Sequence, residues 1–75
     1  MNETDFLEFT AKELLVDADK ISLSTIFRDL PRWSSLNALI YVSRIKEKYN
    51  VMITSQQLAS SKSLGDIYML IQAEH

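Results

Sequence analysis

The chain of 75 residues contains one glycine and one proline. An all-β fold would need many tight turns, and glycine and proline are among the residues most common in such turns. Helices need few such residues, so the scarcity favours an all-α fold. A chain this short can bury only one modest core, and we therefore expect residues 1–75 to form one domain.

The first predicted helix covers residues 3–16. Its acidic start suits a helix N-terminus, and Asn2 or Thr4 could cap it. Apolar residues recur in it at helical spacing, namely Phe6, Leu7, Ala11, Leu14 and Leu15.

Residues 17–33 show no sustained period and predict a long first loop. Ser24 could cap a single turn within it, and Pro31 prevents a continuous helix into the next segment. Three apolar residues can anchor the loop to the core, namely Ile26, Phe27 and Leu30. A connection this long in a small domain is uncommon and is often functional.

A second helix is predicted from Ser34 or Ser35 to about Tyr49, with Asn50 as its stop. Its apolar residues form two adjoining stripes, Leu36, Leu39 and Ile40 on one and Ala38, Val42, Ile45 and Tyr49 on the other. Together the stripes make a face wider than a surface helix needs, which predicts a central helix.

The remaining residues predict a link and two more helices. Residues 51–53 form an apolar run that should be an extended link rather than a strand. Thr54 or Ser55 can cap a short third helix, and Ser63 can cap a last one. The inward residues of the last helix should be Leu64, Ile67, Leu70 and Ile71. The sequence thus predicts a small four-helix bundle with three longer helices, a short third helix and a long first loop.

Several kinds of chemistry lack the residues they need. There are no cysteines for thiolate metal sites, and the single histidine, His75, stands at the chain end, where a catalytic base is improbable. No glycine-rich loop could hold a nucleotide, and the acids lie near Lys or Arg on helical faces. We therefore expect no enzyme activity and no metal. No apolar run is long enough for a membrane span, so we expect a cytoplasmic protein without membrane contact.

Charge is distributed unevenly along the chain. Residues 1–31 carry seven acids and three bases, giving -4, and residues 32–62 carry five bases and one acid, giving +4. A solvated helix face explains the basic middle segment. A small nucleic-acid binder is a distant alternative, because the total charge of -2 is unlike the basic balance of such domains, and we expect no nucleic-acid partner.

The serine doublet at the start of the second helix has two interpretations. One serine can simply cap the helix. Alternatively, another enzyme could modify a serine there, because free backbone N–H groups and a partial positive charge at a helix N-terminus stabilise a phosphate ester. From the residues alone, capping is the simpler interpretation.

The order of these segments resembles the acyl carrier protein family, the phosphopantetheine-binding carrier domains. WSSL at residues 33–36 is similar to the family's Trp and Asp-Ser-Leu motif, and Asp29 with Leu30 resembles its earlier acid and leucine. SLNALIYVSRIKEKYNVMIT is similar to the family's second helix and its exit, and SKSLGDIYMLI to the start of its last helix. The resemblance covers nearly the whole chain and implies a single carrier domain.

The resemblance implies a site and partners. Ser35, directly before the helix-opening leucine, would carry 4'-phosphopantetheine from coenzyme A, attached by a separate phosphopantetheinyl transferase. The arm would hold an acyl group as a thioester for acyl-loading, condensing or acyl-transferring enzymes of fatty-acid, polyketide or other specialised biosynthesis. The residues expected to face partners are Leu36, Leu39, Ser43, Arg44 and Lys48. The residues expected in the core, beside space for an acyl chain, are Ala38, Val42, Ile45, Tyr49, Leu64 and Ile67. The carrier is expected to be a monomer.

Two features of the sequence depart from the family pattern. Ser34 stands where the family has an aspartate, and it can cap the helix in that residue's place. The second helix carries Arg44, Lys46 and Lys48 against Glu47, whereas the family's helix is usually acidic. We therefore expect a specialised carrier with dedicated partners. The alternative is a carrier-like helical module that is not modified and acts only through protein contacts.

Overall fold

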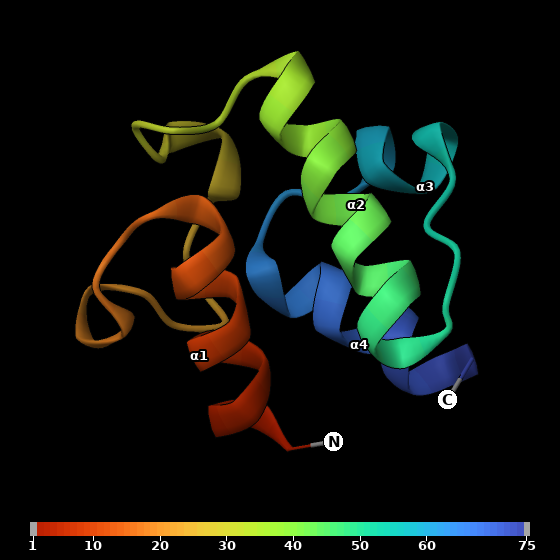
Figure 1. Cartoon of the computed structure of the whole chain (residues 1–75), viewed down its shortest axis with the longest axis horizontal. Coiled ribbons are helices and arrows are strands. Elements are labelled where there is room, and N and C mark those ends of the chain that lie inside the picture. The colour runs from red at the N-terminus through yellow and green to blue at the C-terminus, as the bar shows by residue number, and fades with distance from the viewer. Residues whose placement is uncertain (1, 75) are drawn as a thin grey trace.

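A computed structural model describes residues 2–74, which form four α-helices and two short 3₁₀ turns (Figure 1). The elements are α1 (Glu3–Leu14), η1 (Ala18–Lys20), η2 (Phe27–Asp29), α2 (Ser35–Tyr49), α3 (Ser55–Ser60) and α4 (Leu64–Glu74). The predicted small all-helical fold with a short third helix is confirmed for these residues, and they include no strand. None of the helices found between residues 2 and 74 has both the length and the apolar character needed to cross a membrane.

Helix α1 begins after Asn2, whose Oδ1 accepts a hydrogen bond from the backbone N–H of Asp5 at 2.8 Å. The predicted end at residue 16 is wrong. The helix ends at Leu14, because Leu15 adopts a left-handed backbone with φ of 55°. This turn leaves the Leu15 side chain 68% exposed, although Leu15 continues the apolar spacing of the helix.

The long first loop is held to the core by Ile21 and Phe27, and the predicted anchor Leu30 is partly buried against the core. Phe27 is fully buried in η2, whereas Ile26 is 43% exposed and does not anchor the loop as predicted. The proposed cap at Ser24 is also wrong. Its hydroxyl is hydrogen-bonded to the Ser22 hydroxyl at 2.8 Å, and η2 starts after Ile26 without a side-chain cap.

The same loop pairs with the start of α4. Residues 26 and 63 form a single antiparallel bridge. Three backbone hydrogen bonds join the two segments, from Phe27 N to Lys62 O, from Leu64 N to Thr25 O and from Gly65 N to Leu23 O. A Cβ at Gly65 would lie 2.9 Å from the Leu23 carbonyl oxygen, so the glycine is required by this close approach.

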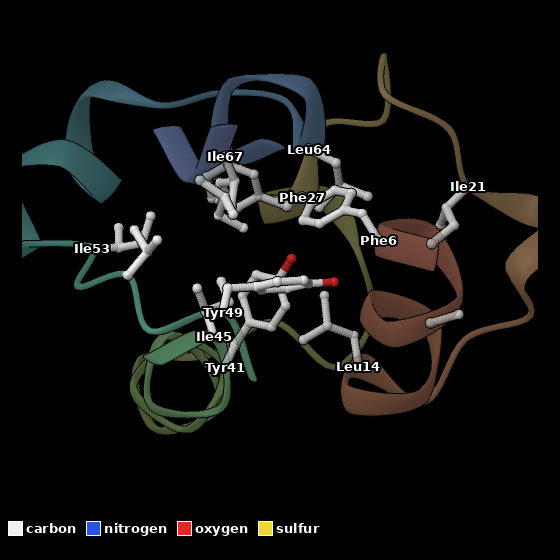
Figure 2. Packing of buried hydrophobic residues seen from close by; sticks show 13 residues of the cluster. Phe6, Leu14, Ile21, Phe27, Tyr41, Ile45, Tyr49, Ile53, Leu64 and Ile67 are labelled. Atoms are coloured by element: carbon white, nitrogen blue, oxygen red, sulfur yellow. The ribbon is translucent and has the colours of Figure 1, made fainter. Parts of the chain in front are cut away.

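The core combines side chains from α1, the first loop, α2, the link after it and α4 (Figure 2). Its fully buried members include Phe6, Phe27, Tyr41, Ile45, Leu64, Ile67 and Ile71. The buried hydroxyls of Tyr41 and Thr10 lie 2.7 Å apart and form a hydrogen bond between α2 and α1. Neither residue is identified as core by the sequence pattern.

Only one of the two predicted apolar stripes of α2 is buried. The residues that face the core are Ala38, Tyr41, Ile45 and Tyr49, and Val42 is partly buried beside them. Leu36, Leu39 and Ile40 are 66%, 63% and 42% exposed. The prediction that the two stripes together form one wide inward face is therefore wrong. Because Tyr41 completes the inward face at helical spacing, the first stripe points outward.

The termini of the last three helices follow the sequence closely. Asn50 ends α2 in a left-handed conformation with φ of 58°. Thr54 caps α3 in a capping box with Gln57. At the start of α4 the Ser63 hydroxyl accepts the N–H of Asp66 at 3.2 Å, as predicted for a cap. The link between α2 and α3 is extended and contains no strand, also as predicted.

The Asp66 carboxylate completes the start of α4. It accepts hydrogen bonds from the backbone N–H groups of Lys62 and Ser63, and these bonds lower the pKa of its carboxyl group. Leu64, Ile67 and Ile71 are fully buried, whereas Leu70 is only partly buried at the edge of the inward face.

Candidate functional site

The serine doublet stands at the start of α2. Ser34 is the N-cap residue, with extended backbone, and its Oγ accepts the N–H of Asn37 at 3.1 Å. The Asn37 side-chain amide in turn donates to the carbonyl oxygen of Arg32. These two bonds fix the turn that leads from the first loop into the helix.

Ser35 is the first residue of α2 and is exposed to solvent. Among residues 2–74, no group accepts the backbone N–H of Ser35 or of Leu36. The first turn also carries no acidic residue. The partial positive charge of this helix end therefore faces solvent beside the Ser35 hydroxyl.

Trp33 holds the segment before the doublet against the core. Its ring lies 4.6 Å from the Phe27 ring and 6.1 Å from the Tyr41 ring, measured between centroids. Its backbone N–H donates to the Leu30 carbonyl at 3.0 Å. Trp33 thus anchors the end of the first loop to the core directly before Ser34 and Ser35.

A groove of about 580 Å³ lies between α2, the link after it and α3. On the α2 side it is lined by Ser35, Ala38, Leu39, Val42, Ser43 and Lys46. On the other side it is lined by Met52, Ile53, Thr54, Ser55 and Leu58. Most of the wall is apolar, and Ser35 belongs to it at the N-terminal end of α2.

Ser55 occupies the same helix position as Ser35. It is the first residue of α3, follows the capping residue Thr54, is exposed and lines the same groove. An exposed serine directly after a capping residue is therefore found at two helix starts, and this local geometry is not unique to Ser35. The two sites differ in their helices, because α2 has 15 residues and α3 has six, and in the residue that follows, Leu36 or Gln56.

The outer surface of α2 next to Ser35 is apolar. Leu36, Leu39 and Ile40 are exposed within the first two turns of the helix, and Ser43 follows one turn later with its hydroxyl donating to the Leu39 carbonyl at 2.9 Å.

The basic residues of α2 have different surroundings. The Arg44 guanidinium lies 3.3 Å from the Glu13 carboxylate of α1 and 3.0 Å from the Glu47 carboxylate, and the hydrogen bond to Glu47 raises the pKa of Arg44. The Lys48 ammonium lies 5.8 Å from the centroid of the Phe9 ring. The basic character predicted for this helix is therefore partly neutralised by acids.

The groove lies beside the core, and only some of the residues expected in the core line it. Of the residues expected beside an acyl chain, Ala38 and Val42 line the groove. Ile45, Leu64 and Ile67 do not line it, because they are fully buried in the packed core, and Tyr49 is buried on the core face of α2. The sequence also gave no indication that Leu58 of α3 and Met52 of the link form the facing wall.

Two further residues that shape this region, Asn37 and Arg28, were not identified from the sequence. Asn37 stands three residues after the cap, where a capping box has a Glu or Gln that accepts the N–H of the cap residue, but its amide donates to the Arg32 carbonyl instead. Arg28 donates to the carbonyls of Ser61 at 2.6 Å and Leu58 at 2.9 Å, and no local pattern indicates this long-range pair. Residues 2–74 contain no cluster of three acidic, His or Cys side chains that could hold a metal, and His75 lies outside them.

The chain was also compared with known proteins. No protein-family model matches it, and no curated protein matches it significantly.

Proposed function

We propose that this protein is an acyl carrier protein with an acyl-carrier-like helical fold. The observation that carries the proposal is Ser35, an exposed serine at the N-terminus of a 15-residue helix and on the wall of an apolar groove of about 580 Å³. The order of a long first loop, the central helix α2, a short α3 and a last helix α4 supports it as well.

The residues around Ser35 fit a phosphodiester. The N–H groups of Ser35 and Leu36 have no acceptor among residues 2–74, and no carboxylate in the first turn would repel a phosphate. The Ser34 hydroxyl already accepts the N–H of Asn37, so capping leaves the Ser35 hydroxyl for modification.

A separate phosphopantetheinyl transferase would load the chain. The bond formed joins Ser35 Oγ to the phosphorus next to the pantetheine of coenzyme A, the pyrophosphate bond breaks, and adenosine bisphosphate leaves while a base of the transferase takes the serine proton. The arm supplies a terminal thiol that holds an acyl group as a thioester. The chain itself then acts as a carrier and not as an enzyme.

The exposed residues near Ser35 are suited to partner contact. Leu36 and Leu39 are more than half exposed, and Ser43, Arg44 and Lys48 continue the accessible surface along α2. The proposed partners are the transferase and the enzymes that load, condense or transfer the acyl group. Because Arg44 is paired with two acids, a partner selected by a strongly acidic patch is less suited than one with mixed charge.

The test is the intact mass of the protein after incubation with coenzyme A and a broad-specificity phosphopantetheinyl transferase. A gain of one phosphopantetheine group is expected for the wild type and for Ser55→Ala, which removes the serine at the matching position of α3. No gain is expected for Ser35→Ala. A wild-type protein that gains no mass, or a gain that persists in Ser35→Ala, would contradict the proposal.

The second candidate is an unmodified carrier-like interaction module. Ser34 favours it, because the doublet lacks the carboxylate that the family places before the modified serine. The variant Ser34→Asp separates the two proposals. A mass gain that occurs only in this variant favours a carrier that has lost modification, and a gain in the wild type excludes the second candidate.

A further inference from the structure

The groove has one charged residue on its wall. Among the described residues that line it, only Lys46 carries a charge. Ser35, Leu39, Val42 and Lys46 follow one another at helical spacing on the same side of α2. The groove therefore has a serine at one end of this stripe and an ammonium group at the other.

Ser35 and Lys46 are separated by an apolar part of the groove wall that is long enough for an aliphatic chain. Lys46 is eleven positions after Ser35 along α2, which corresponds to about 16 Å at ~1.5 Å per residue. Between them the wall consists mainly of Leu39, Val42 and, on the facing side, Ile53 and Leu58. An aliphatic chain can lie along this stretch and bury its methylene groups there.

Lys46 differs in its partners from Arg44, another cation of α2. Its ammonium donates to Asn50 Oδ1 at 2.8 Å, which is a neutral acceptor. Arg44, two positions earlier, is paired with two carboxylates. Within residues 2–74 no carboxylate forms an ion pair with Lys46, so its charge is not compensated, and an ammonium group has donors left for a second acceptor.

From this charge and this wall we propose that the groove selects an aliphatic chain with an anionic end, bound with that end at Lys46. The favoured acyl group of the carrier then derives from a dicarboxylic acid. This identification of the acyl group rests on the proposed function. One carboxyl is joined to the arm as a thioester, and the other is free and pairs with Lys46. The position of Lys46 near the C-terminus of α2 also stabilises the helix, but helix stability does not require it to face the groove.

The experiment is an NMR titration of the unmodified full chain with octanoate and, separately, with octanol, which has the same chain length and no charge. Backbone amide shifts are followed in the wild type, in Lys46→Gln and in the control Lys48→Gln. Octanoate should shift amides of residues 38–46 and 52–58 and bind about fivefold more tightly than octanol, equivalent to ~1 kcal/mol for a partly solvated ion pair.

Lys46→Gln should remove this preference, and Lys48→Gln should keep it, because Lys48 lies against Phe9 and not in the groove. Equal affinities for the two ligands, a preference that survives in Lys46→Gln, or shifts confined to other residues would overturn the inference.

The result is separable from the loading test. If Ser35 gains phosphopantetheine but octanoate shows no preference, the carrier function stands and the inference on the cargo fails. If octanoate is preferred but Ser35 gains no mass, the groove has the inferred specificity and the carrier function fails.

Discussion

Ser34 and Ser35 are neighbours in the chain, but their side chains have different tasks in the helix. The Ser34 hydroxyl accepts the N–H of Asn37, whereas Ser35 is the exposed first helical residue. Ser34→Ala should therefore lower the free energy of unfolding by about 1 kcal/mol, and Ser34→Asp should keep the stability, since aspartate also caps. Urea denaturation measures both.

Ser35→Ala is the matched control for that measurement. It should change the free energy of unfolding by less than about 0.5 kcal/mol, because its side chain caps nothing. An equal loss in Ser34→Ala and Ser35→Ala would show that the capping assignment is wrong.

The buried hydroxyl pair gives a second prediction. Tyr41→Phe leaves the Thr10 hydroxyl without its 2.7 Å partner in a fully buried position and should cost about 1–3 kcal/mol of unfolding free energy. Adding Thr10→Val removes the second polar group, so the double variant should lose less than the sum of the two single losses. Thermal unfolding of the four proteins in a double-mutant cycle measures this coupling, and simple additivity would contradict it.

The burial of Tyr41 leads to a third prediction, a loss of stability at alkaline pH. Burial raises the pKa of Tyr41 above its ordinary value of about 10, so the folded protein retains this proton after the unfolded chain has lost it. The stabilising contribution is complete below about pH 10 and decreases as the pH rises above that value. Urea titrations between neutral and alkaline pH should show the decrease, and Tyr41→Phe should reduce it. Tyr49, whose pKa burial also raises, should retain part of the effect in that variant.

At the scale of an element, α3 depends on a contact from outside itself. None of its residues is fully buried, and Arg28 of the first loop donates to the carbonyls of Ser61 and Leu58 at its C-terminal end. Arg28→Ala should increase amide hydrogen exchange at residues 58 and 61 about tenfold, which corresponds to ~1.4 kcal/mol for hydrogen bonds from a charged donor.

Arg32→Ala is the control for charge, because Arg32 is exposed and its side chain donates to no group in α3. Exchange in α1 should be unchanged in both variants. If exchange rises equally throughout the protein, Arg28 stabilises the whole fold rather than α3 in particular.

The helices were predictable where local chemistry decides their limits. Ser34, Asn50, Thr54 and Ser63 act at helix ends, and a sequence shows such residues directly. The end of α1 was missed because Leu15 adopts a left-handed backbone that its residue type does not favour. The burial of Tyr41 in α2 was missed, because this residue has a polar group whose hydrogen-bond partner, Thr10, lies 31 positions away.

At the scale of the whole molecule, Gly65 joins the first loop to α4. Its N–H donates to the Leu23 carbonyl at 2.7 Å, and a Cβ would lie 2.9 Å from the same oxygen. Gly65→Ala should therefore force the two segments apart and lower the free energy of unfolding by about 1–3 kcal/mol. Thermal denaturation checks this. Ser60→Ala, at an exposed position, should leave the midpoint nearly unchanged, and a stabilised Gly65→Ala would contradict the prediction.

The candidate site shows the limit of prediction at this scale. The position of Ser35 at the head of α2 could be predicted, since only the capping pattern and the residues around it are needed. The groove could not be predicted, because its walls come from α2, the link and α3, and the sequence does not state how these elements face each other. The prediction that Ile45, Leu64 and Ile67 belong to the core is confirmed, but which core residues border the groove could not be predicted.

The pairing between the first loop and the start of α4 has a consequence for the order of events during synthesis. The loop that leads to the serine doublet makes its backbone bonds with residues 62–65, which leave the ribosome almost 30 positions after Ser35. A nascent chain that ends before those residues has no partner for the loop, so the segment before Ser35 cannot yet take its final path. An enzyme that recognises the folded loop would therefore act only on chains whose last helix has begun to emerge, and incomplete chains would be left unloaded.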